Sequence, residues 1–447
     1  MPLSVMDEKK FYGWVNLGVV ALISLVTEGL LLLSFAVFLP YICNEFNWSR
    51  GSVSGAMAVT TALGGLISPL AGIFIAKFGA RAAIILGNSI AVIACLLLSF
   101  HNQIWQFYLG SGILMGLAIG LGGPIATTTT INNWFIKKRS IGIAIVLSCG
   151  SLGGLILVPL IQFIISSLGW RHAYLIMAAT TLVLSIIIPG ILVRNKPEDL
   201  GQVPDGKIDS DPENAGPSPI PKRRDVYRTP VDFEFKEAIR TPCLWFLTLV
   251  LCLQMLGTAG LLAHGVAFLI DIGIAAGAAS FAFGLFSGIG TVGRLGVGFL
   301  GLRYDVKKLA LGSLVIMIIG MIILIYTKTF AMAILFSCVL GIGSGGIMVS
   351  VMNMIPNYFG NKNYPKIMGF MTPFFIIIGG LSSPIAGIIS DMTGSYILYF
   401  QSGLILLVIS SVLLYFARPP LHPSLIEGKV LNSQIGSQPE NNQSELA

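Results

Sequence analysis

Long apolar runs with few or no charges recur from one end of this 447-residue chain to the other. About 20 consecutive apolar residues are enough for a helix to cross the hydrocarbon core of a membrane. Hydrophobic residues make up 55% of the chain and charged residues only 11%, against roughly a quarter charged in an average globular protein. Because so few charges cannot cover the surface of a soluble protein of this length, the pattern predicts that lipid surrounds most of the chain.

Twelve runs reach spanning length, in two groups of six separated by a polar stretch. The first group runs over about 14–42, 52–76, 82–100, 104–134, 140–168 and 172–193. The second group runs over about 243–270, 278–302, 308–327, 330–358, 366–390 and 395–417. The sequence therefore predicts an all-α integral membrane protein with 12 transmembrane helices in two six-helix bundles. We expect four parts: an N-terminal bundle, a linker, a C-terminal bundle and a flexible tail, over 1–193, 194–240, 241–418 and 419–447.

The two halves contain an internal echo. Gly64–Ile73 reads GGLISPLAGI and Gly379–Ile388 reads GGLSSPIAGI, with eight of ten positions identical. Internal repeats of this kind are typical of transporter folds, so we expect the two bundles to be pseudo-symmetric. The shared glycines, alanine and serine predict close packing of both segments against neighbouring helices.

The distribution of basic residues sets the orientation in the membrane. The short segments on one side carry Lys9, Lys10, Lys77, Arg81, Lys137, Lys138, Arg139, Arg303, Lys307, Lys308, Lys362, Lys366 and Arg418. Those on the other side carry only Arg50, Arg171 and Lys328. Basic loops stay in the cytoplasm, so we expect both termini to be cytoplasmic in a cell inner (plasma) membrane. This orientation also accounts for the net charge of +7 without a nucleic-acid partner.

Two charged residues lie well inside predicted spans, Glu28 in the first and Arg294 in the eighth. A central charge costs roughly 2.5–3.5 kcal/mol, so each should face a cavity or a partner. Arg294 is about eight residues from the end of its run, roughly 12 Å at ~1.5 Å per residue. Its planar donor fork matches a carboxylate, which makes Arg294 a candidate for substrate binding. The alternative is a structural ion pair with Glu28.

Glu28 and His264 are the candidates for proton coupling. A carboxyl group removed from water favours its neutral form and can load and release a proton; alternatively, Glu28 is permanently protonated and hydrogen-bonded to Ser24 or another helix. His264 is the only histidine well inside a predicted span, and imidazole titrates near physiological pH. It suits proton coupling or substrate binding, and equally a neutral core residue. Asn353 is a weaker candidate for substrate binding, because polar groups in such helices usually serve packing.

Other classes of function lack the residues that they need. The sequence contains no nucleophile paired with a base, no metal-ligand cluster and no phosphate-binding loop. The linker holds seven prolines and a near-even mixture of acids and bases, as a solvated segment does, and Val231–Arg240 is its one candidate amphipathic helix. We therefore expect neither an enzyme nor a cofactor or metal site.

The six-plus-six arrangement, the long linker and the internal echo resemble the major facilitator superfamily. The segment from Gly72 to Arg81, GIFIAKFGAR, is similar to that family's signature between the second and third helices. It differs at Ala76, where an aspartate is usual. A looser copy follows the eighth run, from Gly298 to Asp305.

Finer motifs resemble the branch of monocarboxylate transporters and oxalate:formate antiporters. These motifs are Tyr12–Trp14, Phe46–Arg50, Trp134–Arg139, Gly169–Arg171 and Pro384–Tyr396. The resemblance implies an anion-recognising arginine in the eighth helix, the place that Arg294 occupies. Oxalate antiporters are expected to add a lysine in the eleventh helix, whereas Met368–Ser390 contains no base. Relatives often have a tyrosine midway along the fourth helix, where this chain has Gly122–Pro124.

We therefore predict a secondary active transporter that moves a small organic monocarboxylate by alternating access, with proton symport. An organic-anion antiporter is the alternative within transport. A transporter-like carboxylate sensor is the alternative from another class. The expected partners are the carboxylate, protons and the lipid bilayer, and we expect the monomer to be the functional unit.

Overall fold

The structure is a computed structural model that describes residues 11–48, 50–206 and 227–422. Within these residues the chain is helical and contains no strand. Twelve of the described segments are long and apolar enough to cross a membrane, which confirms the predicted number of spans. Lys9, Lys10, the linker centre at 207–226 and the tail from 423 lie outside the described residues.

The first six spans come from the N-terminal half, and several consist of consecutive helical segments. In order they are α1 (Gly13–Ser24), η1 (Leu25–Leu33) and α2 (Phe35–Phe46); α3 (Arg50–Phe78); α4 (Ala80–Phe100); α5 (Ile104–Phe107), η2 (Tyr108–Leu114), α6 (Met115–Gly122) and α7 (Pro124–Trp134); α8 (Arg139–Leu168); and α9 (Trp170–Leu182), η3 (Val183–Ile187) and α10 (Ile188–Leu192).

The described parts of the linker contribute three short helices, and the C-terminal half forms its six spans from single helices. In order they are η4 (Pro197–Leu200), η5 (Pro204–Gly206), α11 (Phe235–Arg240), α12 (Pro242–Asp271), α13 (Ala276–Leu300), α14 (Val306–Ile325), α15 (Phe330–Phe359), α16 (Tyr364–Thr393) and α17 (Ile397–Phe416). The helix α11 lies inside the range 231–240 for which a short helix is predicted. The division into these four parts stays a prediction.

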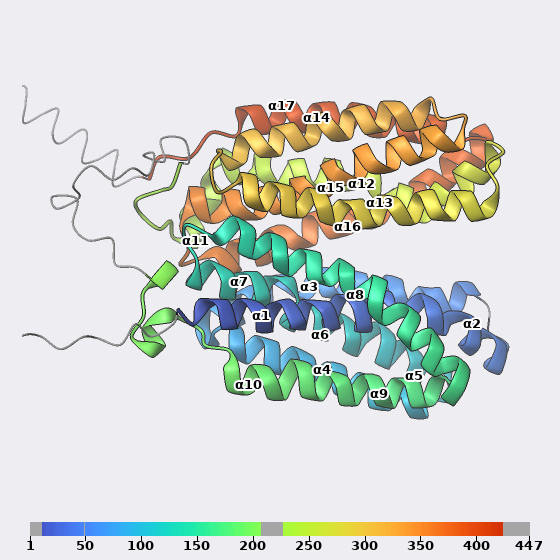
Figure 1. Ribbon diagram of the computed structural model, residues 1–447, viewed down its shortest axis with the longest axis horizontal. Coiled ribbons are helices and arrows are strands. Elements are labelled where there is room, and N and C mark those ends of the chain that lie inside the picture. Colours follow the sequence, from blue (N-terminus) through green and yellow to red (C-terminus); the bar gives the residue numbers. More distant parts are fainter. Residues whose placement is uncertain (1–10, 49, 207–226, 423–447) are drawn as a thin grey trace, which may run out of the picture.

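The helices of each half lie together, and the two groups lie side by side (Figure 1). Across the boundary, α3 packs on α16 and α8 packs on α13. The start of α1, the linker helices and the end of α17 lie at the same end of the molecule (Figure 1). We call this end the linker face and the opposite end the far face.

Close contact between the halves depends on glycine where α3 meets α16. A Cβ atom at Gly72 would overlap the carbonyl oxygen of Pro365, and one at Gly369 would overlap that of Ser68. Small residues allow helix backbones to approach in this way inside a membrane. Gly64–Ile73, the first echoed segment, therefore includes part of the boundary between the halves. The second, Gly379–Ile388, approaches α12 at Met255 and His264.

The described parts of the linker bind equivalent loops of the two halves at the linker face. The Asp205 carboxylate accepts hydrogen bonds from the backbone N–H groups of Ile136, Lys137 and Lys138, in the loop between α7 and α8. The Asp232 carboxylate accepts one from the N–H of Asn361, at 2.8 Å, in the loop between α15 and α16. The Arg228 guanidinium group also donates to the backbone oxygen of Ile136, at 2.9 Å, so the second part of the linker contacts both bundles.

Candidate functional site

A cavity of about 760 Å³ lies between the two halves. Its lining on the N-terminal side is Glu28, Leu33, Pro124, Leu147, Ser151, Leu152, Gly154, Leu155 and Val158. Its lining on the C-terminal side is Gln254, Met255, Thr258, Ala259, Leu262, Gly284, Phe286, Gly288, Gly290, Thr291, Val292, Arg294, Ser344, Met348 and Met352. The cavity is mostly apolar, with a few polar groups, as small-molecule sites usually are.

The linker face is packed below the cavity. The first lining residue of α8 is Leu147, eight residues after the helix begins at Arg139, and the lining continues toward the far face as far as Val158. At the linker face itself, Arg139 Nη1 donates to Asn357 Oδ1 at 3.3 Å, which links the two halves. Tyr364 and Thr128 form another link through their hydroxyl groups, at 3.2 Å. The site is therefore closed by packing on the side of the linker.

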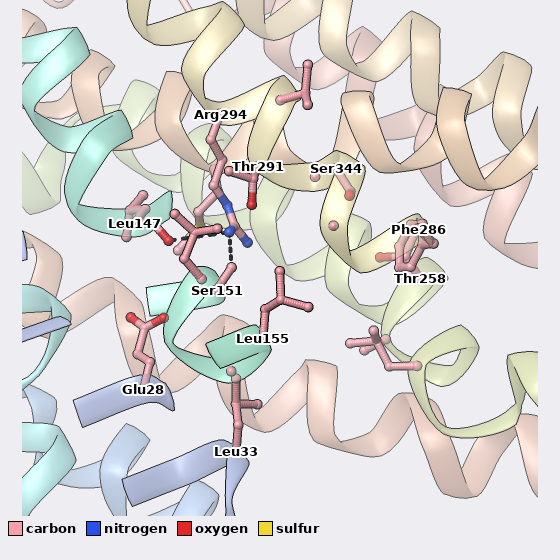
Figure 2. A pocket seen from close by; sticks show the side chains of 18 of the residues that line it. Glu28, Leu33, Leu147, Ser151, Leu155, Thr258, Phe286, Thr291, Arg294 and Ser344 are labelled. Carbon is pink, nitrogen blue, oxygen red and sulfur yellow. Dashed lines mark hydrogen bonds between the residues drawn. The ribbon is translucent and has the colours of Figure 1, made fainter. Parts of the chain in front are cut away.

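Arg294 reaches across the boundary from α13 to α8. Its Nη1 atom donates to the backbone oxygen of Leu147 at 3.3 Å and to the hydroxyl oxygen of Ser151. Figure 2 shows the guanidinium group above these two acceptors, on the wall of the cavity. Within the described part of the chain, Nε and Nη2 of Arg294 make no hydrogen bond, so three of its five N–H groups are available to a ligand.

Glu28 belongs to η1, the π-helical segment in the middle of the first span. Such segments occur often at functional sites, because the wider turn changes which side chains face a neighbouring helix. A Cβ atom at Gly150 of α8 would collide with the Glu28 carboxylate, and the backbones of Gly29 and Gly153 meet nearby. Glycine in α8 therefore makes the space in which Glu28 lies.

Glu28 and Arg294 line one cavity without forming an ion pair. None of the salt bridges formed by the described residues joins them. Figure 2 shows the Ser151 side chain pointing to the guanidinium group, with the Glu28 carboxylate farther away. Glu28 and Arg294 are also the one acid and the one base among the described residues that line the cavity.

Neutral polar groups on the C-terminal side add hydrogen-bonding capacity. Gln254 Nε2 donates to the Thr258 hydroxyl at 3.0 Å, and Thr258 donates to the Gln254 backbone oxygen at 2.8 Å. No donor among the described residues reaches the Gln254 side-chain oxygen. The N-terminal wall, by contrast, is leucine-rich except for Glu28 and Ser151. Both sides are therefore mostly apolar, and each contributes a few polar groups.

Two of the predicted site residues lie elsewhere. His264 of α12 is close to Ser383 and Tyr396: its Nε2 is 3.1 Å from the Ser383 backbone oxygen and its Nδ1 is 3.3 Å from the Tyr396 hydroxyl. Asn353 is buried in α15, and its side chain donates to the Val349 backbone oxygen at 2.8 Å. Neither belongs to the described lining of the cavity, and their roles stay predictions.

Sequence reasoning missed Ser151 and underrated Arg139. Ser151 carries no signal of its own, because serine is common in membrane helices. Arg139 stands beside Lys137 and Lys138 at the edge of an apolar run and is counted there as a loop charge, yet only 4% of it is exposed. The Asn357 contact across the boundary explains its burial, and such a contact has no local sequence pattern.

The family model of the Major Facilitator Superfamily matches residues 17–304 and 267–439. Among curated proteins, Monocarboxylate transporter 12 of Rattus norvegicus is 25% identical over 432 residues, which cover 91% of this chain and 85% of the relative. Monocarboxylate transporter 13 of Bos taurus is 25% identical over 413 residues, 90% of each chain. These matches confirm the resemblance expected from the motifs.

The same fold occurs in solved structures. A crystal structure of the E. coli fucose:proton symporter superposes with a TM-score of 0.69 at 16% sequence identity, covering 92% of this chain and all of that one. A second structure of this symporter, in the outward conformation, gives a TM-score of 0.68 at 14% identity. The fold, the multi-pass membrane class and the prediction of a transporter rather than an enzyme are thereby confirmed. The chain belongs to the Major Facilitator Superfamily of membrane transporters and is related to its monocarboxylate transporters.

Proposed function

We propose that this protein is a secondary transporter that moves a small organic monocarboxylate together with a proton. The observation that carries the proposal is the position of Arg294 on the wall of a mostly apolar cavity between the two bundles. Arg294 retains Nε and Nη2 for a ligand, and no carboxylate of the described residues forms an ion pair with it. A guanidinium edge of this kind binds a carboxylate through two parallel hydrogen bonds.

The number of charges in the site favours one carboxylate. Arg294 is the single base among the described lining residues, so a second carboxylate on the same ligand would be desolvated without a cationic partner, which is costly. The curated relatives are named as monocarboxylate transporters, which agrees with this choice. Both walls come from one chain, as a functional monomer requires.

Glu28 is the proposed proton carrier. It lines the same cavity as Arg294, and within the described part of the chain its carboxylate makes no hydrogen bond. When Glu28 is protonated, the positive charge of Arg294 is uncompensated and attracts an anion. Binding of the anion then leaves the site without net charge, which lowers the cost of closing it inside the membrane.

Transport would follow from rocking of the two bundles around this site. We assign the linker face to the cytoplasm of a cell with the protein in its inner (plasma) membrane, because the short basic loops lie there. In that orientation the packed contacts of Arg139 and Tyr364 close the cytoplasmic side, and the cavity belongs to the outward-facing state. Inward opening requires the contacts between α8 and α13 and between α3 and α16 to separate.

Uptake into proteoliposomes tests the binding site. Labelled formate, acetate, pyruvate and lactate would be offered to the wild type and to Arg294→Ala, Arg294→Lys and Arg303→Ala. We expect Arg294→Ala to lower uptake roughly a hundredfold, as loss of one partner from a buried charged pair does. Arg294→Lys keeps the positive charge but lacks the planar pair of donors, so it should recover only part of the wild-type uptake. Arg303, exposed just beyond α13, is the matched control. Unchanged uptake in Arg294→Ala would reject this site.

An imposed pH gradient tests the proton. Wild-type protein should accumulate the acid when the outside is more acidic, whereas Glu28→Gln should exchange it across the membrane without responding to the gradient. Strict dependence on an internal counter-anion, with no response to the gradient in the wild type, would favour the antiporter. Binding without uptake would favour the carboxylate sensor.

A further inference from the structure

We propose that Ser151 is a positioning residue for Arg294: it fixes the guanidinium group on α8, presents the Nε–Nη2 edge to the carboxylate, and keeps Arg294 from pairing with Glu28. This inference rests on the proposed function, because it concerns the geometry of the same anion site. It starts from a hydrogen bond between side chains of opposite halves, Arg294 Nη1 to Ser151 Oγ.

The orientation follows from counting donors. A guanidinium group has two N–H on Nη1, two on Nη2 and one on Nε. The Leu147 oxygen and the Ser151 hydroxyl both accept from Nη1. They stand four residues apart, so one face of α8 presents both. A carboxylate that binds end-on needs donors on both Nη1 and Nη2, and Nη1 is already used by these two acceptors. The side-on edge of Nε and Nη2 remains, and it matches the two oxygens of a carboxylate.

Glu28 is the internal competitor for that edge. It is the one acid among the described residues that line the cavity. An arginine side chain has several rotatable bonds, so a guanidinium group released from α8 can turn toward the nearest carboxylate. Such a pair would neutralise the binding charge before a substrate arrives. Two adjacent residues of α8 keep the groups apart: Gly150 makes room for Glu28, and Ser151 holds Arg294.

Ser151→Ala is the direct test, measured as uptake of the best-transported acid among formate, acetate, pyruvate and lactate. A hydrogen bond to a charged group contributes enough for about a tenfold effect, so we expect the half-saturating concentration to rise about tenfold and the maximal rate to stay within about twofold. Ser151→Thr keeps the hydroxyl and should restore the wild-type value. Ser148→Ala is the matched control, because Ser148 is buried in α8 and its hydroxyl has no partner among the described residues.

A double mutant separates positioning from a merely structural role. If Ser151 acts by keeping Arg294 away from Glu28, then Glu28→Gln removes the competitor, and Ser151→Ala should add less than about twofold in that background. A tenfold penalty that persists in Glu28→Gln would reject the competition. Because Glu28→Gln loses the proposed proton site, the comparison uses substrate exchange at equal pH on both sides.

The role of Ser151 can also be tested without a transport assay, by determining a structure of the variant. In a structure of Ser151→Ala we expect the Arg294 guanidinium group within ion-pair distance of the Glu28 carboxylate. A guanidinium group that stays on the Leu147 oxygen would overturn the inference. Arg294→Ala without effect on uptake would reject the proposed function. Loss in Arg294→Ala with wild-type behaviour in Ser151→Ala would reject only the positioning role.

Discussion

Two arginines link the halves of this transporter, and they differ in what surrounds them. Arg139 begins α8, is 4% exposed, and donates to Phe135 in its own half and to Asn357 in the other. Arg294 lies in the spanning helix α13, six residues before its last residue Leu300, and donates to α8 through a single nitrogen atom. The first stands in a packed closure and the second on the wall of a cavity.

The difference shows that a bond across the boundary does not by itself define a role. Arg139 is buried and donates to Phe135 and Asn357, so its bond belongs to a packed contact between the halves. Arg294 lines a cavity, and the same kind of bond leaves donors that a ligand could reach. The neighbourhood of each guanidinium group, rather than its charge, distinguishes a packed contact from a candidate binding site.

Among variants that leave the side chains of the cavity unchanged, the largest effect is expected where the backbone positions Arg294. A Cβ atom at Gly345 of α15 would overlap the backbone oxygen of Gly290. The same atom would lie 3.1 Å from the backbone nitrogen of Arg294. Gly345→Ala should therefore displace α13, and we expect uptake to fall at least tenfold with lower thermal stability, as overpacking does. Gly296→Ala in α13 is the control, because nothing lies within 4 Å of the added atom. Equal activity of the two variants would contradict this account of the helix contact.

Arg139→Met tests the closure separately from the site. Loss of the bond to Asn357 should favour the state that is open at the linker face, so the apparent affinity for external substrate should fall about threefold, in proportion to the lost outward population. Binding in detergent, where both sides are accessible, should stay unchanged. Asn357→Ala removes the same bond and should behave alike. Weaker binding in detergent would mean that Arg139 contributes to substrate binding and not to closure of the linker face.

The fold and the two charged residues of the cavity could be predicted because membrane sequences are constrained by lipid. Spanning length and the exclusion of charge mark the helices, and Glu28 and Arg294 stand out against that background. Ser151 could not be found, because its role depends on the register between α8 and α13. The burial of Arg139 depends on the second bundle, which packs over the end of its helix. Local pattern shows which residues are unusual, and tertiary contact shows which residues cooperate.

His264→Gln should have a small effect. Its contacts with Ser383 and Tyr396 join α12 to α16 and to the start of α17 within one half, away from the described lining of the cavity. Loss of these hydrogen bonds should lower the midpoint of thermal unfolding slightly, with uptake and its response to a pH gradient within about twofold of wild type. A loss of the gradient response equal to that of Glu28→Gln would instead assign the proton step to His264.

The smallest effect is expected at the exposed pair of Glu234 and Lys362, whose side chains are 60% and 67% exposed. The hydrogen bond with the Lys362 ammonium group, at 3.0 Å, lowers the pKa of Glu234, and the same contact raises the pKa of Lys362. The pair therefore contributes between the ordinary glutamate and lysine ranges and is lost only as the pH falls through the lowered glutamate pKa or rises through the raised lysine pKa.

Glu234→Gln should accordingly leave uptake and the midpoint of thermal unfolding nearly unchanged at pH 7, as exposed ion pairs usually do. The difference between this variant and wild type should also stay constant from about pH 5 to 9, since neither group titrates there. In Arg139→Met, whose bond lies in the packed closure, uptake and the midpoint of thermal unfolding should differ from wild type throughout that interval. A shift in Glu234→Gln as large as that in Arg139→Met would mean that the exposed linker contact, and not the buried arginine, holds this face closed.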